Sequence, residues 1–146
     1  MLECAAAEVA RMSGGVLAAG DGDVAVAGVT TDSRKVFGRE LFVALDGERF
    51  DGHDFVWKAF ASGCSAAMVS RALRGGQLPA NAALIEVPDG YAGLGRLAAA
   101  HRRSFEMPWV AVTGSCGKST TKELIAATLG GGKDILKAEA SFNNRV

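Results

Sequence analysis

The sequence predicts an α/β fold: a small α/β domain with a largely parallel sheet, followed by the start of a P-loop nucleotide-binding domain that is truncated. Short apolar runs alternate with helix-like segments between Leu2 and Phe105, which is the pattern of strands joined by helical crossovers. Farther along, a Gly-rich turn lies between an apolar run and a helix-like segment, as in phosphate-binding loops. The composition is that of a globular protein, because 49% of the 146 residues are hydrophobic and 22% are charged.

The first predicted elements are one helix and two strands. Apolar residues at helical spacing predict a helix over residues 2–12, which ends before the turn Ser13-Gly14-Gly15. A β-branched run predicts a strand over residues 24–30. Residues 40–45 read as a buried strand, because they are mostly apolar and end at the turn dipeptide Asp46-Gly47.

Two helices and two more strands complete the first domain. Asp54 is placed to cap a helix over residues 55–63. Apolar runs bounded by turn residues predict strands over residues 66–70 and 83–87. A Pro-Asp-Gly turn then opens a long Ala- and Leu-rich helix over residues 91–105, which a proline ends.

The motif content changes after this helix, so we predict a domain boundary that separates residues 1–107 from residues 108–146. The second domain should begin with a strand over residues 109–113, a helix over residues 118–129 and a strand over residues 134–137. A doubly wound nucleotide-binding sheet needs more strands than these, so we expect the chain to hold only the beginning of that domain.

Charge and cysteine usage narrow the classes of function. Sixteen basic and sixteen acidic residues cancel, which argues against nucleic acid as a partner. No apolar run reaches the roughly 20 residues that a membrane-spanning helix needs, and no basic region precedes an apolar stretch at the N-terminus. Cys4, Cys64 and Cys116 are widely spaced, which fits a reducing cytoplasm better than a disulfide framework or a structural zinc site. We therefore expect a cytoplasmic protein without a membrane partner, and we also expect a monomer.

The turn after Thr113 carries the strongest functional signal. Its backbone, formed by Gly114, Ser115, Cys116 and Gly117, is expected to wrap phosphate groups at the N-terminus of the following helix. The first glycine of the general Walker A pattern is replaced by a valine, so the loop is a shorter variant. The alternative is an ordinary strand–turn–helix with a surface lysine.

The side chains of this turn have separate expected roles. Lys118 is the expected catalytic residue, in contact with the β- and γ-phosphates of a nucleotide, and Ser119 is the expected Mg²⁺ ligand. Thr120 contacts phosphate or caps the helix. The thiol of Cys116 is either a reactive group beside a helix N-terminus or a small side chain that fills the turn.

Other polar residues are candidates for binding. Thr31, Ser33 and Arg34 follow a predicted strand, where hydroxyls and an arginine fork can hold a pyrophosphate or a ribose, or form a solvated turn. His53, in a turn rich in Gly and Asp, is open to a capping role or a ligand-binding role. Near the C-terminus, Asn143-Asn144 is either a turn or a binding segment.

Three regions together resemble the Mur ligase family, whose members are ATP-dependent enzymes that build the peptide stem of bacterial cell-wall precursors. The regions are Thr30–Arg34 with Gly38–Gly47 and Asp51–Phe55, the loop Thr113–Thr120, and Ser141–Asn144. The resemblance implies that residues 1–107 bind a UDP-muramyl peptide and that residues 108–146 begin the central ATPase domain.

The resemblance also assigns expected contacts. Thr31, Ser33 and Arg34 would contact the UDP part of the substrate, and His53 would approach its nucleotide end. Asn143 and Asn144 would lie near the substrate and the transferred phosphate. The family often has Asn-x-Asn-Asn here, and this chain has Ser141 in the first place, so that first contact departs from the pattern.

Within the family, the Ser141–Asn144 segment and the dipeptide Lys122-Glu123 are most similar to members that add D-alanyl-D-alanine to UDP-N-acetylmuramoyl-tripeptide through an acyl phosphate. ATP and Mg²⁺ would be the cofactors of that peptidoglycan-precursor ligase. The alternatives are a family member that adds the third stem residue, a UDP-sugar-binding fragment without catalysis, and a P-loop kinase or GTPase. Because the chain stops at Val146, before later magnesium ligands and an adenine pocket, we expect this chain alone to be inactive.

Overall fold

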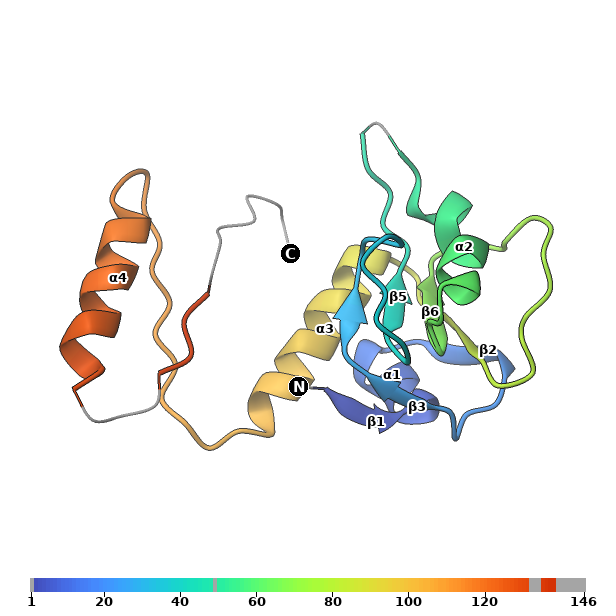
Figure 1. The fold of residues 1–146 in the computed structure, drawn as a ribbon, viewed down its shortest axis with the longest axis horizontal. Coiled ribbons are helices and arrows are strands. Elements are labelled where there is room, and N and C mark those ends of the chain that lie inside the picture. Colours follow the sequence, from blue (N-terminus) through green and yellow to red (C-terminus); the bar gives the residue numbers. More distant parts are fainter. Residues whose placement is uncertain (1, 49, 132–134, 139–146) are drawn as a thin grey trace. The chain divides into compact units, whose positions relative to one another are not determined.

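The fold is that of a computed structural model, which describes residues 2–48, 50–131 and 135–138 (Figure 1). These residues divide into two compact units, one that ends at Phe105 and one that starts at Glu106. The first unit contains a sheet with helices on both faces, and the second contains one helix. The domain boundary between residues 107 and 108, with a different ligand for each part, stays a prediction.

The centre of the first unit is a five-stranded sheet in the order β2-β7-β6-β5-β4. Four neighbouring strands are parallel: β4 (Val29–Thr30), β5 (Leu41–Val43), β6 (Ala66–Val69) and β7 (Ala83–Glu86). At one edge, β2 (Val16–Gly20) pairs antiparallel with β7. The predicted α/β fold with a largely parallel sheet is therefore confirmed.

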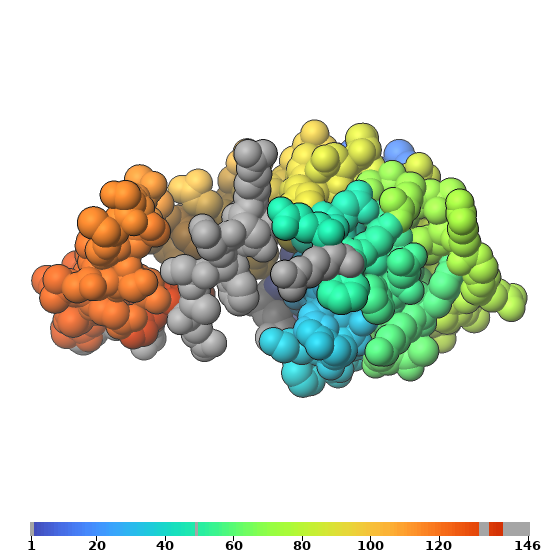
Figure 2. All heavy atoms as spheres, turned by 90° about the horizontal axis from the view of Figure 1, so that it is seen from above, coloured from blue at the N-terminus to red at the C-terminus, as the bar shows by residue number. Residues whose placement is uncertain are grey.

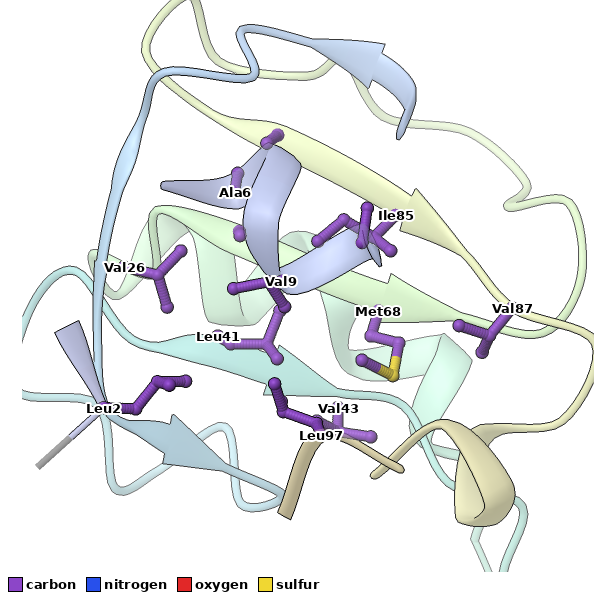
Figure 3. Packing of buried hydrophobic residues seen from close by; sticks show 13 residues of the cluster. Leu2, Ala6, Val9, Val26, Leu41, Val43, Met68, Ile85, Val87 and Leu97 are labelled. Atoms are coloured by element: carbon purple, nitrogen blue, oxygen red, sulfur yellow. The ribbon is translucent and has the colours of Figure 1, made fainter. Parts of the chain in front are cut away.

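Helices bury both faces of this sheet. On one face, α1 (Ala6–Ser13) and α3 (Gly90–Arg103) contribute to a cluster that includes the fully buried Leu41 and Val43 (Figure 3). On the other face, α2 (Val56–Ala61) packs in a second cluster that includes Phe42. Leu41 and Val43 lie on one face and Phe42 on the other, because successive side chains of a strand point to opposite faces. Because both faces of the sheet are buried, the sequences of the central strands are continuous apolar runs.

The start of the chain differs from the prediction. The helix predicted over residues 2–12 is preceded by a strand, β1 (Glu3–Ala5), which pairs antiparallel with β3 (Ala25–Ala27). The predicted strand over residues 24–30 is two strands, β3 and β4, because Gly28 between them takes a φ of 103° that breaks the extended run. Sequence reasoning missed β2, whose five residues are all exposed.

The helix that follows β5 begins at a different cap from the one predicted. A 3₁₀ turn, η1 (Gly52–Phe55), precedes α2, and the side chain of Asp51 accepts a hydrogen bond from the backbone N–H of His53. Asp54 therefore lies inside the first turn and is not the cap. The long helix α3 is capped by Asp89, whose carboxylate accepts from the N–H of Ala92 at 2.7 Å.

In the second unit, α4 (Lys118–Leu129) confirms the predicted helix at both ends. The strands predicted over residues 109–113 and 134–137 are not confirmed, since residues 109–113 and 135–137 are irregular and Asp134 lies outside the described residues. A strand requires a neighbouring strand for its backbone hydrogen bonds, and the described residues of this unit form none.

Candidate functional site

An open cavity of about 490 Å³ lies at the carboxyl ends of β4 and β5. One wall is the turn Thr31–Arg34, which follows β4 directly. The opposite wall comes from the segment between β5 and α2. Figure 2 shows the two segments, light blue and blue-green, beside each other on one face of the first unit. Ligands commonly bind at this edge of a parallel sheet, because the loops after neighbouring strands converge there.

The turn Thr31–Arg34 holds its arginine in a fixed position. The guanidinium of Arg34 donates to both carboxylate oxygens of Asp32, from Nε at 2.8 Å and from Nη2 at 2.9 Å. The Arg34 backbone N–H adds a bond to the same carboxylate at 3.0 Å. These interactions hold the pKa of Asp32 well below its usual range and raise the pKa of Arg34. A two-point pair of this kind fixes the orientation of the guanidinium.

All three binding residues predicted in this turn, Thr31, Ser33 and Arg34, line the cavity. Ser33 is buried, whereas the Arg34 side chain is 78% exposed. The structure therefore brings these residues together, and their contact with a substrate stays a prediction.

The opposite wall is aromatic and carries one cation. Phe42 and Phe55 line it together with Phe50, whose ring is 73% exposed. Lys58 of α2 also lines the cavity, and sequence reasoning missed it. The available signal was its spacing, since Lys58 lies three residues after Phe55 and so shares its side of the helix. Together the two walls offer two cations, hydrogen-bonding hydroxyl groups and flat apolar rings.

The candidate residue His53 lies in η1, between the cavity-lining residues Gly52 and Phe55. The residues that line the cavity do not include it, and its side chain is buried with only 5% of the residue exposed. Its Nδ1 lies 2.7 Å from Oδ1 of Asp51, and its Nε2 accepts the backbone N–H of Ser70 at 3.0 Å. Both ring nitrogens thus have protein partners, which supports a structural role, and a contact with the substrate stays a prediction.

Asp46, Asp51 and His53 place one ligand atom each within 4.8 Å of one another, a spacing that could suit a metal ion. The guanidinium of Arg71, however, pairs with the carboxylates of both Asp51 and Asp46. A cation of the protein therefore already pairs with both carboxylates of this cluster, and we assign it no metal.

The predicted phosphate loop lies in the second unit. Gly117 immediately precedes α4 with a φ of 76°, a conformation that favours glycine. The Nζ of Lys118 donates to the carbonyl of Gly114 at 2.5 Å, so the lysine folds back over the loop. Ser115, Cys116, Ser119 and Thr120 are all exposed around the start of the helix.

This geometry fits a nucleotide phosphate with Mg²⁺. The first N–H groups of a helix have no partner within it, and they bind anions. The Lys118 ammonium lies at the loop, bonded to the Gly114 carbonyl, and the Ser119 hydroxyl lies in the first turn of α4, the position of the magnesium ligand in phosphate-binding loops. Ser141, Asn143 and Asn144, the other predicted contacts, lie outside the described residues.

Among the described residues, no helix is both long enough and apolar enough to cross a bilayer.

Comparison with known proteins places the chain in a family. The sequence profile described as "Mur ligase family, catalytic domain" matches residues 25–102. The UDP-N-acetylmuramoyl-tripeptide–D-alanyl-D-alanine ligase of Bacillus subtilis (strain 168) is 42% identical over 119 residues, which cover 82% of this chain and 26% of that protein.

Solved structures agree with the sequence match. A crystal structure of MurF from Acinetobacter baumannii aligns with a TM-score of 0.73 at 31% identity, over 89% of this chain and 28% of that one. The MurF ligase of Thermotoga maritima in complex with ADP aligns with a TM-score of 0.62 at 33% identity, over 71% of this chain and 23% of that one. The chain thus spans about a quarter of the length of these relatives. On this match in sequence and fold, the chain belongs to the Mur ligase family.

Proposed function

We propose that this chain serves an ATP-dependent ligase that adds D-alanyl-D-alanine to UDP-N-acetylmuramoyl-tripeptide during peptidoglycan synthesis. The similarity to the Bacillus subtilis enzyme supports this substrate pair. The observation that carries the proposal is the cavity beside β4 and β5, where predicted UDP contacts meet an aromatic wall. We place the reaction in the cytoplasm, where it would support cell-wall growth, cell shape and division, and we expect a monomer.

In this proposal the first unit binds the UDP part of the substrate. The diphosphate would lie between Arg34 and Lys58, because both cations line the cavity. The hydroxyls of Thr31 and Ser33 would bond to phosphate or ribose oxygens. The uracil ring would stack on Phe50, whose ring is exposed and lines the same cavity.

The second unit would bind ATP through the loop before α4. The backbone from Gly114 to Gly117 would surround the phosphates, and Ser119 would hold Mg²⁺. The ADP complex of the Thermotoga maritima relative supports the nucleotide. Bound Mg²⁺ supplies positive charge to the phosphates, and Lys118 would add a second positive charge where the transferring phosphoryl group gains negative charge.

The proposed reaction has two steps. The terminal carboxylate of the tripeptide attacks the γ-phosphorus of ATP, which forms an acyl phosphate and releases ADP. The amine of D-alanyl-D-alanine then attacks the acyl carbon, loses a proton, and phosphate leaves. Holding the carboxylate and the amine together lowers the entropic part of the barrier.

The first test is a pair of amide NMR titrations of this chain, one with UDP-N-acetylmuramoyl-tripeptide and one with Mg-ATP. We expect saturable shifts at Ser33 and Arg34 with the UDP compound, weak binding of Mg-ATP near Lys118, and no turnover. Arg34→Ala should weaken binding of the UDP compound, whereas Arg11→Ala, which removes a similarly exposed arginine from α1, should not. Tight ATP binding without a response to the UDP compound would refute the proposal and favour a P-loop kinase or GTPase.

Two alternatives within the family predict different results. A ligase that adds the third stem residue would bind UDP-N-acetylmuramoyl-dipeptide in preference to the tripeptide. A UDP-sugar-binding fragment without catalysis would bind the UDP compound and show no response to Mg-ATP at the loop Thr113–Thr120. The two titrations, repeated with the dipeptide compound, therefore separate all three.

A further inference from the structure

We propose that His53 is a positioning residue, which holds Leu45, Phe50 and Gly52 in place as one wall of the cavity. It does so through a clamp that consists of Asp51, His53 and Ser70. The inference rests on the proposed function, because the wall matters for binding only if the cavity takes the UDP compound.

The hydrogen bonds of the ring fix its tautomer. The backbone N–H of Ser70 can only donate, so Nε2 of His53, at 3.0 Å from this nitrogen, must accept. In the neutral ring the proton then lies on Nδ1, which faces the carboxylate of Asp51 at 2.7 Å. His53 therefore accepts on one side and donates on the other, a pair of roles that few side chains can fill.

The clamp joins a loop to the middle of the sheet. The two sides of this loop pair with each other, since the N–H of Gly47 donates to the carbonyl of Phe50 at 3.0 Å and the N–H of Gly52 donates to the carbonyl of Leu45 at 2.9 Å. Asp51 closes this loop, whereas Ser70 directly follows the central strand β6. The buried ring of His53 thus ties the base of the loop to a strand that is buried on both faces.

The loop needs this support, because packing does not hold its tip. Leu45, Phe50 and Gly52 all line the cavity, but the ring of Phe50 is 73% exposed. The base allows little adjustment, since a Cβ at Gly52 would lie 2.6 Å from the backbone nitrogen of Leu45. The position of the Phe50 ring over the cavity therefore depends on how the base is fixed. Arg71 adds ion pairs to the carboxylates at both ends of the loop.

Two substitutions separate the halves of the clamp. In His53→Asn the shorter amide can still donate to Asp51, as Nδ1 does, but nothing reaches the N–H of Ser70. In His53→Gln the longer amide places an oxygen where Nε2 lies, so this N–H keeps its acceptor. Ser70→Ala is the matched control, because it keeps the backbone N–H and removes only the hydroxyl, at 3.3 Å from Nε2.

The measurement is the Kd for UDP-N-acetylmuramoyl-tripeptide, with circular dichroism to confirm folding. Loss of one buried hydrogen bond corresponds to about a fivefold rise in Kd, which we expect for His53→Asn. His53→Gln keeps the acceptor for Ser70 but loses the donor to Asp51, so its Kd should rise by a similar factor, whereas Ser70→Ala should stay within about twofold of the unchanged chain. A folded His53→Asn or a folded His53→Gln with unchanged Kd would overturn the proposal. If His53→Asn does not fold, the Kd of His53→Gln decides in the same way.

A second readout works without any ligand and separates the clamp from the proposed function. Amide hydrogen exchange in the free chain should be faster in His53→Asn and in His53→Gln than in the unchanged chain or Ser70→Ala at Leu45, Phe50 and Gly52, with the strands β5 and β7 unchanged. If the unchanged chain does not bind the UDP compound, the proposed function fails and exchange alone decides the clamp. Exchange in both variants as slow as in the unchanged chain would then exclude it.

Discussion

The thiol of Cys64 gives the sharpest prediction of stability against pH. Cys64 is only 6% exposed and packs in the cluster between α2 and the sheet. Burial, and secondarily the negative charge of Glu40, raise the pKa of this thiol from the ordinary 9.0 to about 11. The unfolded chain therefore loses this proton near pH 9, whereas the folded chain keeps it until about pH 11.

The sign and the size of the effect follow from linkage. Between these two pKa values the folded state binds more protons than the unfolded state, so the free energy of unfolding falls as the pH rises. The contribution is fully present below pH 9 and is lost through about pH 11. At roughly 1.4 kcal/mol for each pKa unit, the loss is about 2–3 kcal/mol, a large part of the stability of a small domain.

Urea denaturation of the unchanged chain and of Cys64→Ala, under reducing conditions across this pH window, measures the effect. Cys64→Ala leaves a small cavity and lowers stability by an amount that does not depend on pH, so the slopes are compared and not the absolute values. Lysine and tyrosine titrate in both proteins, and their contributions cancel in the difference. Parallel slopes for the two proteins would refute the reasoning.

Three other predictions concern the fold and the turn of the cavity. Leu41→Ala should lower the free energy of unfolding in urea by about 2–5 kcal/mol, since Leu41 is fully buried. Phe37→Ala, at a ring that is 91% exposed, is its control and should change stability by less than about 0.5 kcal/mol. Asp89→Ala should cost about 1 kcal/mol in the same assay, because it removes the cap of α3, and a loss no larger than that of Phe37→Ala would contradict the capping role. The pKa of the Asp32 carboxyl, measured by NMR titration, should lie well below its ordinary value, because Arg34 pairs with it. The stabilisation from this pair is therefore present at neutral pH and is lost as the pH falls through the lowered pKa. Arg34→Ala should move this titration toward the ordinary value of 3.8, and an unmoved midpoint would exclude the ion pair as its cause.

Local signals predicted the fold where the sequence pattern alone determines an element. The strands β5, β6 and β7 were predicted because helices cover both faces of the sheet, which leaves each strand as a continuous apolar run. The helix α4 was predicted at both ends, since glycines flank it. By contrast, β2 is exposed and rich in Ala and Gly, so it is a strand only through its pairing with β7, which no local pattern encodes.

In the candidate site, too, local sequence predicted some residues, whereas others depend on contacts between distant segments. The turn Thr31–Arg34 was found because its residues are adjacent in the sequence and directly follow a strand. Lys58 and the hydrogen bonds of His53 were not predicted, because each depends on how one segment packs against another. His53 is seventeen residues from Ser70, and only the parallel arrangement of β5 and β6 brings the two together.

Phe42 belongs both to the packed cluster around α2 and to the aromatic wall of the cavity. A ligand in the cavity would therefore rest directly on the hydrophobic core, with no layer of polar side chains between them at this ring. Occupancy and resistance to heat should then rise together, and a ligand at one hundred times its Kd would add about 2.7 kcal/mol to the stability of the first unit. A simple thermal-shift screen of nucleotides could thus identify ligands of this chain without any assay of turnover.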